Sequence, residues 1–144
     1  MNTVPPLRML GPVQAILLAF PIALFTAAVV SDITYLRTAE IQWSNFSSWL
    51  IAGGLFFGGF VALLALVGFL GSGRRHGRRL TYLLLIAAMW VIGFINALLH
   101  SRDAWYSVTP MGAFLSVVTA LLVLIAAWIG YSAFPREEIH DARA

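Results

Sequence analysis

The sequence predicts an all-α integral membrane protein: a single membrane domain over residues 1–144, folded as an up-down-up-down bundle of four transmembrane helices. Of its 144 residues, 60% are hydrophobic and only 10% are charged, and the mean hydropathy is +0.88. Soluble domains carry about a quarter charged residues, so a surface of this composition is suited to lipid. Four apolar segments reach the length of about 20 residues that crosses the hydrocarbon core.

The first two spans are expected at residues 12–35 and 47–70, with residues 36–46 as their connection. Pro12 opens the first span, and its fixed φ suits the first turn of a helix. A polar run rich in glycine and arginine follows residue 70 and ends the second span.

The third and fourth spans are expected at residues 80–101 and 110–134. Thr109 followed by Pro110 indicates an N-cap and a first helical residue. Pro135 then ends the fourth span, because proline cannot continue a helix. The three predicted connections, residues 36–46, 71–79 and 102–109, are short. Short connections favour antiparallel neighbouring helices.

The arginines predict the orientation, because basic residues near span ends stay on the cytoplasmic side. The connection between the second and third spans carries four of them: Arg74, Arg75, Arg78 and Arg79. With that connection inside, seven arginines lie inside against two outside. We therefore expect both termini to be cytoplasmic. All nine basic residues are arginine and none is lysine, a composition common in GC-rich bacterial genomes, so the membrane is expected to be a bacterial inner membrane. The four arginines of that connection are expected to attract anionic lipid head groups.

A stripe of small residues on the second span, Gly54, Gly58 and Ala62, is expected to pack against another helix. Lipid tails are as apolar as leucine, so transmembrane helices associate where small side chains let their backbones approach. Two interpretations stay open: a seam inside one chain's bundle, or the contact face of a homodimer.

Polar residues gather toward the outer end of three spans. Asp32 shares a helical face with Phe25 and Ala28, and Asn96 shares one with His100. The predicted cluster has six members: Asp32, Asn96, His100, Arg102, Asp103 and Ser116. Ionisable residues at membrane depth are costly and face the bundle interior or water, so any site of this protein is expected here.

Several interpretations of this cluster remain open. Asp32 paired with Arg102 or His100 would lock the helices in register. The alternatives are a proton or ion relay through Asp32 and His100, or haem held by His100, either with Met111 or with His100 of a second chain. A general base at His100 is a further alternative, but no nucleophile or metal-ligand set stands at a recognisable spacing. No resident cofactor or metal other than this haem alternative is expected.

Composition excludes cysteine chemistry and argues against a nucleic-acid partner. The chain has no cysteine, so disulfides and thiolate sites cannot form. Its net charge is only +3 and its arginines lie in no binding motif, so no nucleic-acid partner is expected. The expected partners are the lipid bilayer and either another membrane protein or a second copy of this chain, as a homodimer.

The chain resembles the bacterial membrane-protein family catalogued as domain of unknown function 2231. The resemblance rests on three stretches: Phe20–Leu24 with Asp32, Trp49–Gly54, and Asn96–Trp105 running on to Pro110, Gly112 and Leu115–Ser116. It implies a four-helix inner-membrane protein of unestablished activity. Many members have a histidine near the start of the first span, where this chain has Gln14. That difference argues against a role shared by two histidines at opposite ends.

These observations favour a non-enzymatic accessory or scaffold component of the membrane. A haem-binding or redox protein using His100 is the second hypothesis, and a small proton- or ion-linked transporter is the third. The sequence shows no internal repeat or pair of broken helices, which mark many secondary transporters.

Overall fold

A computed structural model describes residues 7–71, 76–102 and 108–134 of the chain. It contains four long helices, and each is long and apolar enough to cross a membrane. Their bounds are α1 Pro12–Thr38, α2 Ile41–Leu70, α3 His76–His100 and α4 Pro110–Tyr131. The predicted four-helix membrane bundle is confirmed.

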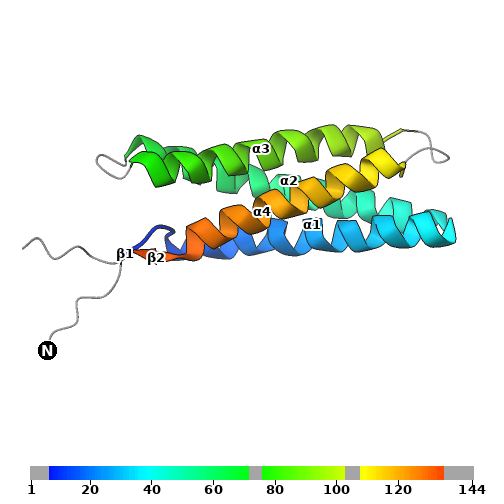
Figure 1. Cartoon of the computed structure of the whole chain (residues 1–144), viewed down its shortest axis with the longest axis horizontal. Coiled ribbons are helices and arrows are strands. Elements are labelled where there is room, and N and C mark those ends of the chain that lie inside the picture. The colour runs from blue at the N-terminus through cyan, green and yellow to red at the C-terminus, as the bar shows by residue number, and fades with distance from the viewer. Residues whose placement is uncertain (1–6, 72–75, 103–107, 135–144) are drawn as a thin grey trace, which may run out of the picture.

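The helices form a closed ring, because each one packs against its neighbours in chain order and α4 returns to α1. Figure 1 shows the ends of α1 and α3 at one end of the bundle, which we call the aspartate end because Asp32 lies near it. The end of α2 and the start of α3, with Arg78 and Arg79, lie at the opposite end, which we call the arginine end.

The connection between α1 and α2 is much shorter than the sequence predicts. It consists of Ala39 and Glu40, and Ala39 takes the left-handed conformation with φ of 56° while its N–H bonds the carbonyl of Tyr35. The predicted start of the second span at residue 47 was therefore wrong by six residues. At 1.5 Å per residue α2 is about 45 Å long, against about 30 Å of hydrocarbon. Hydropathy marks only the apolar part of such a helix.

The other helix ends also differ from the predicted ones. α3 begins four residues before residue 80, and α4 ends at Tyr131 rather than residue 134. The last predicted turn is instead a strand, β2 (Ala133–Phe134), which pairs antiparallel with β1 (Leu7–Arg8). This short pairing joins the segment before α1 to the segment after α4 at the arginine end (Figure 1). The predicted N-cap is confirmed, since the Thr109 hydroxyl accepts a hydrogen bond from Gly112 N–H at 3.2 Å.

Small residues of α2 lie against large side chains of its neighbours inside the bundle. A methyl group on Gly54 would lie 2.8 Å from the ring of Phe25 in α1, and one on Gly58 would lie 3.1 Å from Met89 in α3. Ala62, the third member of the predicted stripe, is half-buried. The first two glycines thus allow the close approach of α2 to α1 and α3 within a single chain.

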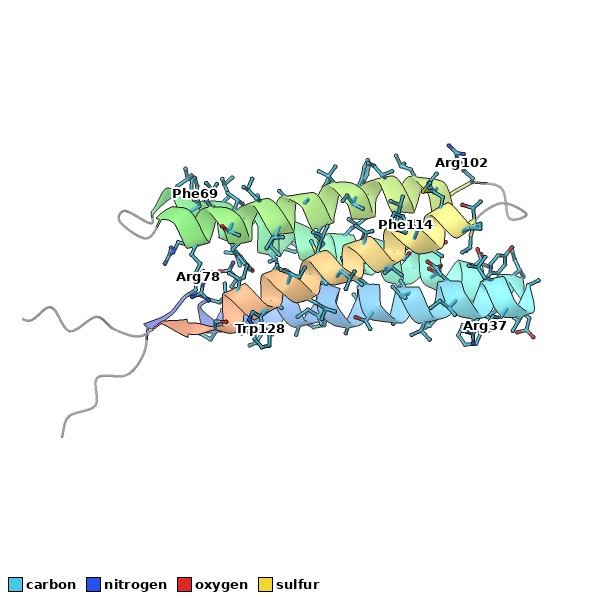
Figure 2. All side chains as sticks on the ribbon, viewed as in Figure 1. Arg37, Phe69, Arg78, Arg102, Phe114 and Trp128 are labelled. Carbon is cyan, nitrogen blue, oxygen red and sulfur yellow. The ribbon has the colours of Figure 1, made fainter. Side chains whose placement is uncertain are left out.

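The interior between the ends is apolar, and so is the exterior. The largest fully buried apolar side chains are those of Leu18, Phe25, Ile51, Val61, Ile86, Met89 and Val123. Large apolar side chains also cover the outside, where Trp128 is 80% exposed and Trp49 79% exposed. Figure 2 shows Trp128 pointing away from the bundle. An exterior of this kind requires lipid, not water, as its surroundings.

Candidate functional site: a buried aspartate–histidine pair

The Asp32 carboxylate is the centre of a polar cluster inside the aspartate end of the bundle. Asp32 lies six residues before the end of α1, about 9 Å along the axis, and it is fully buried. Its helical face carries Pro21, Phe25 and Ala28, all of them buried, as the periodicity predicts. The face that packs α1 into the core therefore also carries the carboxylate into the interior.

Each of the other three helices contributes a hydrogen-bond partner to this carboxylate. Ser47 of α2 donates its hydroxyl to Oδ1, and Ser116 of α4 donates to Oδ2 at 2.5 Å. His100 of α3 places Nε2 3.0 Å from Oδ1. Since all four helices meet at one side chain, the cluster fixes their relative heights and rotations.

Asn96 extends the network by one further bond. Its Nδ2 donates to Ser116 Oγ at 2.7 Å, so the serine accepts from Asn96 while donating to Asp32. Asn96 lies one turn before His100 on α3, and both are buried. Spacing of four residues brings both side chains to the same face, as predicted.

The hydrogen-bond partners of His100 determine how many protons the pair holds. Nδ1 lies 3.0 Å from the backbone oxygen of Asn96, which can only accept, so Nδ1 carries a hydrogen. The contact between Nε2 and Asp32 then needs one more proton, located on either the ring or the carboxyl group. Both arrangements leave the pair without net charge, which is the least costly state for two ionisable groups inside a membrane.

The carbonyl oxygen of the Asn96 side chain is a buried acceptor that has no hydrogen-bond partner within the described part of the chain. It faces Gly112 of α4, where a methyl group would lie 3.8 Å from this oxygen and 3.2 Å from Cε1 of His100. Glycine at this position thus lets α4 pack directly against the two polar side chains.

The structure brings together four of the six predicted cluster residues: Asp32, Asn96, His100 and Ser116. Arg102 is exposed, and Figure 2 shows it pointing away from the bundle. Of the two predicted partners for Asp32, the structure selects His100, because the α3 face that carries Asn96 continues to residue 100 and not to residue 102. Asp103 lies outside the described residues.

Ser47 is a member of the site that the sequence interpretation missed. It was placed at the very start of the second span, where a serine attracts no notice. A signal was nevertheless present, because Ser47 lies seven and eleven residues before Gly54 and Gly58 and therefore shares their helical face. All three are buried in the bundle.

Haem ligation by His100 stays a prediction, but the geometry sets a condition on it. Both ring nitrogens are already hydrogen-bonded, and the side chain is fully enclosed. Met111, the suggested second ligand, is 60% exposed on the outside of α4. Within one chain the two side chains therefore lie in different surroundings, and ligation would require the bond to Asp32 to break.

A second polar group lies at the arginine end. Arg79 donates to the carbonyl of Gly68 in α2, and Arg78 donates to the carbonyl of Ile129 in α4 at 2.8 Å. Each carbonyl belongs to the last turn of its helix, where backbone oxygens lack helical partners. These two arginines thus cap helix ends, a role the sequence interpretation did not assign. Arg74 and Arg75 lie outside the described residues.

The two polar groups are separated by apolar packing. Near Arg79, the side chains of Gln14 and Tyr82 line a cavity of about 20 Å³, room for one water molecule. From Tyr82 to Asn96 along α3 is 14 residues, or about 21 Å. The buried α3 side chains between them include Ile86 and Met89, which cannot relay a proton.

The fold and the site together define a small polytopic membrane protein whose four helices converge on one buried polar pair. The chain belongs to the family described as predicted membrane protein (DUF2231), whose model matches residues 11–143. That match confirms the resemblance seen in the sequence. No curated protein and no solved structure matches the chain.

Proposed function

We propose that this protein is a non-enzymatic accessory or scaffold component that presents its lipid-facing helix surfaces to another membrane protein or to a second copy of itself. One observation carries the proposal: the side chains of Asp32 and His100 are wholly enclosed, and their partners come from all four helices. A catalytic or transport site must meet its substrate. Here the polar atoms hold the bundle together instead.

We place the protein in the inner membrane of a bacterium, with the arginine end and both termini in the cytoplasm. The orientation in this placement is supported by the seven-to-two distribution of arginines. The β1–β2 pairing also supports it, because it brings the segment before α1 and the segment after α4 to the same end as Arg78 and Arg79 (Figure 1).

The orientation is testable without background because the chain has no cysteine. Ser101→Cys at the aspartate end and Gly77→Cys at the arginine end replace exposed residues. In intact cells a membrane-impermeant maleimide should label Ser101→Cys only, and permeabilised cells should add Gly77→Cys. The reverse pattern would invert the proposed topology.

The scaffold role is tested by photo-cross-linking in native membranes, with a photoreactive residue placed in turn at Trp49 and Trp128. These two side chains project from different helices, α2 and α4, and both are highly exposed. We expect one position to give a discrete protein adduct and the other only lipid adducts. A protein that is monomeric and gives no protein adduct at either position contradicts the proposal.

The competing functions give different results in Asp32→Asn and His100→Ala. For a scaffold, both variants lose thermal stability, and the wild type shows no pH-dependent flux in proteoliposomes. A flux that a folded Asp32→Asn variant abolishes would establish the transporter instead. A Soret band that His100→Ala removes after haem supplementation would establish the haem protein.

A further inference from the structure

A small cavity lies at the arginine end, where α1, α2 and α3 meet. Its polar side chains are those of Gln14 on α1 and of Arg79 and Tyr82 on α3, and the other residues that line it are apolar or glycine. Its volume is about 20 Å³, which admits one particle of about the size of a water molecule. A phosphate, a carboxylate or an acyl chain is too large for it.

The Tyr82 hydroxyl needs a hydrogen-bond acceptor at this cavity. The residue is 2% exposed, and no atom among the described residues meets hydrogen-bond geometry at its oxygen. The side chain of Gln14 lies beside the hydroxyl and lines the same cavity. Because a buried hydroxyl without a partner is costly, a small acceptor in the cavity would stabilise the folded chain.

The charged side chain at the cavity is positive. The Arg79 guanidinium has five N–H donors and no acceptor, and the donor on Nη1 bonds the carbonyl of Gly68. The acidic side chains within the described ranges are Asp32 and Glu40, and both belong to the aspartate end. In the part of the chain that the structure describes, no carboxylate therefore balances Arg79.

The start of α1 adds to the positive potential, because helix N-termini carry unpaired N–H groups and a partial positive charge. α1 begins at Pro12, two residues before Gln14. Its N-cap residue, Gly11, supplies no side-chain cap, and its first turn contains no acidic residue. The end of α2 carries the opposite dipole to the same cavity, but Arg79 offsets it by bonding the Gly68 carbonyl directly. The remaining potential favours an anion over a cation.

We propose that this cavity binds one monatomic anion, chloride in the cell. The Tyr82 hydroxyl and a further N–H of Arg79 donate hydrogen bonds to the ion, with the Gln14 amide as a third donor. Chloride is only slightly larger than water, and its attraction to the guanidinium is stronger in a half-buried site than in bulk water. The bound ion links α1 to α3 at the arginine end. The site is independent of the scaffold role, since it does not involve the Asp32 cluster.

The test is thermal unfolding of the full chain in mild detergent at constant ionic strength, with chloride replaced by gluconate, which is too large for the cavity. A ligand that binds only the folded chain stabilises it. Once the site is mostly filled, each tenfold increase in chloride should raise the melting temperature by about 3–5 °C, and bromide should act as chloride does. A melting temperature that stays constant from about 10 mM to about 1 M chloride would overturn the proposal.

Two neighbouring arginines provide a matched pair of variants. Arg79→Gln should abolish the response to chloride, and Arg79→Lys should keep part of it because the charge remains. Arg78→Gln removes the same charge from the next residue, whose guanidinium bonds the carbonyl of Ile129 and does not line the cavity. This control should respond to chloride as the wild type does. Equal losses in Arg78→Gln and Arg79→Gln would show a general charge effect and refute the site.

Tyr82→Phe tests the cavity with a smaller change, and it serves as the decisive variant if Arg79→Gln fails to fold. It should respond to chloride less than the wild type does, because the ion loses one donor. Stability comparisons of Tyr82 variants therefore belong in chloride-free buffer. An unchanged chloride response in folded Tyr82→Phe would contradict the proposed site.

Bromide locates the ion, because its anomalous scattering distinguishes it from water. Crystals of the full chain grown in bromide should show an anomalous peak between the Tyr82 hydroxyl and the Arg79 guanidinium. Density without anomalous signal at this position would assign a water molecule and overturn the proposal. A bromide peak without any dependence of the melting temperature on chloride would mean binding at crystal concentration only, which overturns it as well.

Discussion

Two glycines of α2, five residues apart, should differ in stability when each is replaced by alanine. Gly54→Ala and Gly59→Ala each replace a glycine inside a helix, which by itself favours the helix by about 1 kcal/mol. A Cβ at Gly59 would make an ordinary contact, 3.6 Å from Trp90 Nε1. A Cβ at Gly54 would lie 2.8 Å from both Cε1 and Cζ of Phe25.

The Phe25 ring cannot yield easily to a methyl group on Gly54. The side chain is 1% exposed, and on α3 a Cβ at Gly93 would lie 3.5 Å from Phe25 Cζ. Overpacking a core of this kind costs about 1–3 kcal/mol. We expect Gly59→Ala to raise the free energy of unfolding by up to about 1 kcal/mol. Gly54→Ala should fall about 1–3 kcal/mol below it, a difference in which helix propensity cancels.

The measurement is unfolding in mixed micelles with increasing sodium dodecyl sulfate, followed by tryptophan fluorescence. A coupling experiment identifies the clash: in a Phe25→Leu background, Gly54→Ala should lose most of its penalty. Equal stabilities of the two alanine variants, or a penalty that the Phe25→Leu background leaves unchanged, would show that the close approach at Gly54 does not limit packing.

Three further predictions use the same unfolding measurement. Thr109→Ala should cost about 1 kcal/mol through loss of the cap on Gly112 N–H, and Thr109→Ser should restore it; equal stability of all three proteins would exclude the cap. Asp32→Ala and His100→Ala should each lower the free energy of unfolding by about 3–5 kcal/mol, because each leaves the other group buried without its partner. The double variant should lose less than the sum of the two single losses. Additive losses would contradict the pairing of Asp32 with His100. Tyr82→Phe should change stability by less than about 1 kcal/mol, since no protein atom among the described residues meets hydrogen-bond geometry at its buried hydroxyl. A larger loss would reveal a bond of this hydroxyl to Gln14, which lines the same cavity, or to a bound water.

The sequence predicts the spans of this protein well because the bilayer constrains them directly. Hydrocarbon thickness sets their length and excludes charge, so four apolar stretches are visible in composition alone. The interior faces of α1, α3 and α4 can also be recognised from the sequence. Within each of these helices buried polar and small residues recur at helical spacing. The three faces carry Asp32, Asn96 and Ser116, and the structure places these three side chains together.

Only the tertiary structure decided which side chains meet. Hydropathy gave no reason to prefer His100 over Arg102 as the partner of Asp32, or to include Ser47 at all. Those choices depend on the rotation and height of each helix, which are set by contacts such as Phe25 against Gly54. The bilayer determines that four helices cross it, because every apolar residue contributes to the preference for lipid. Packing between particular side chains determines how the four helices meet, and no single stretch of sequence contains both partners of such a contact.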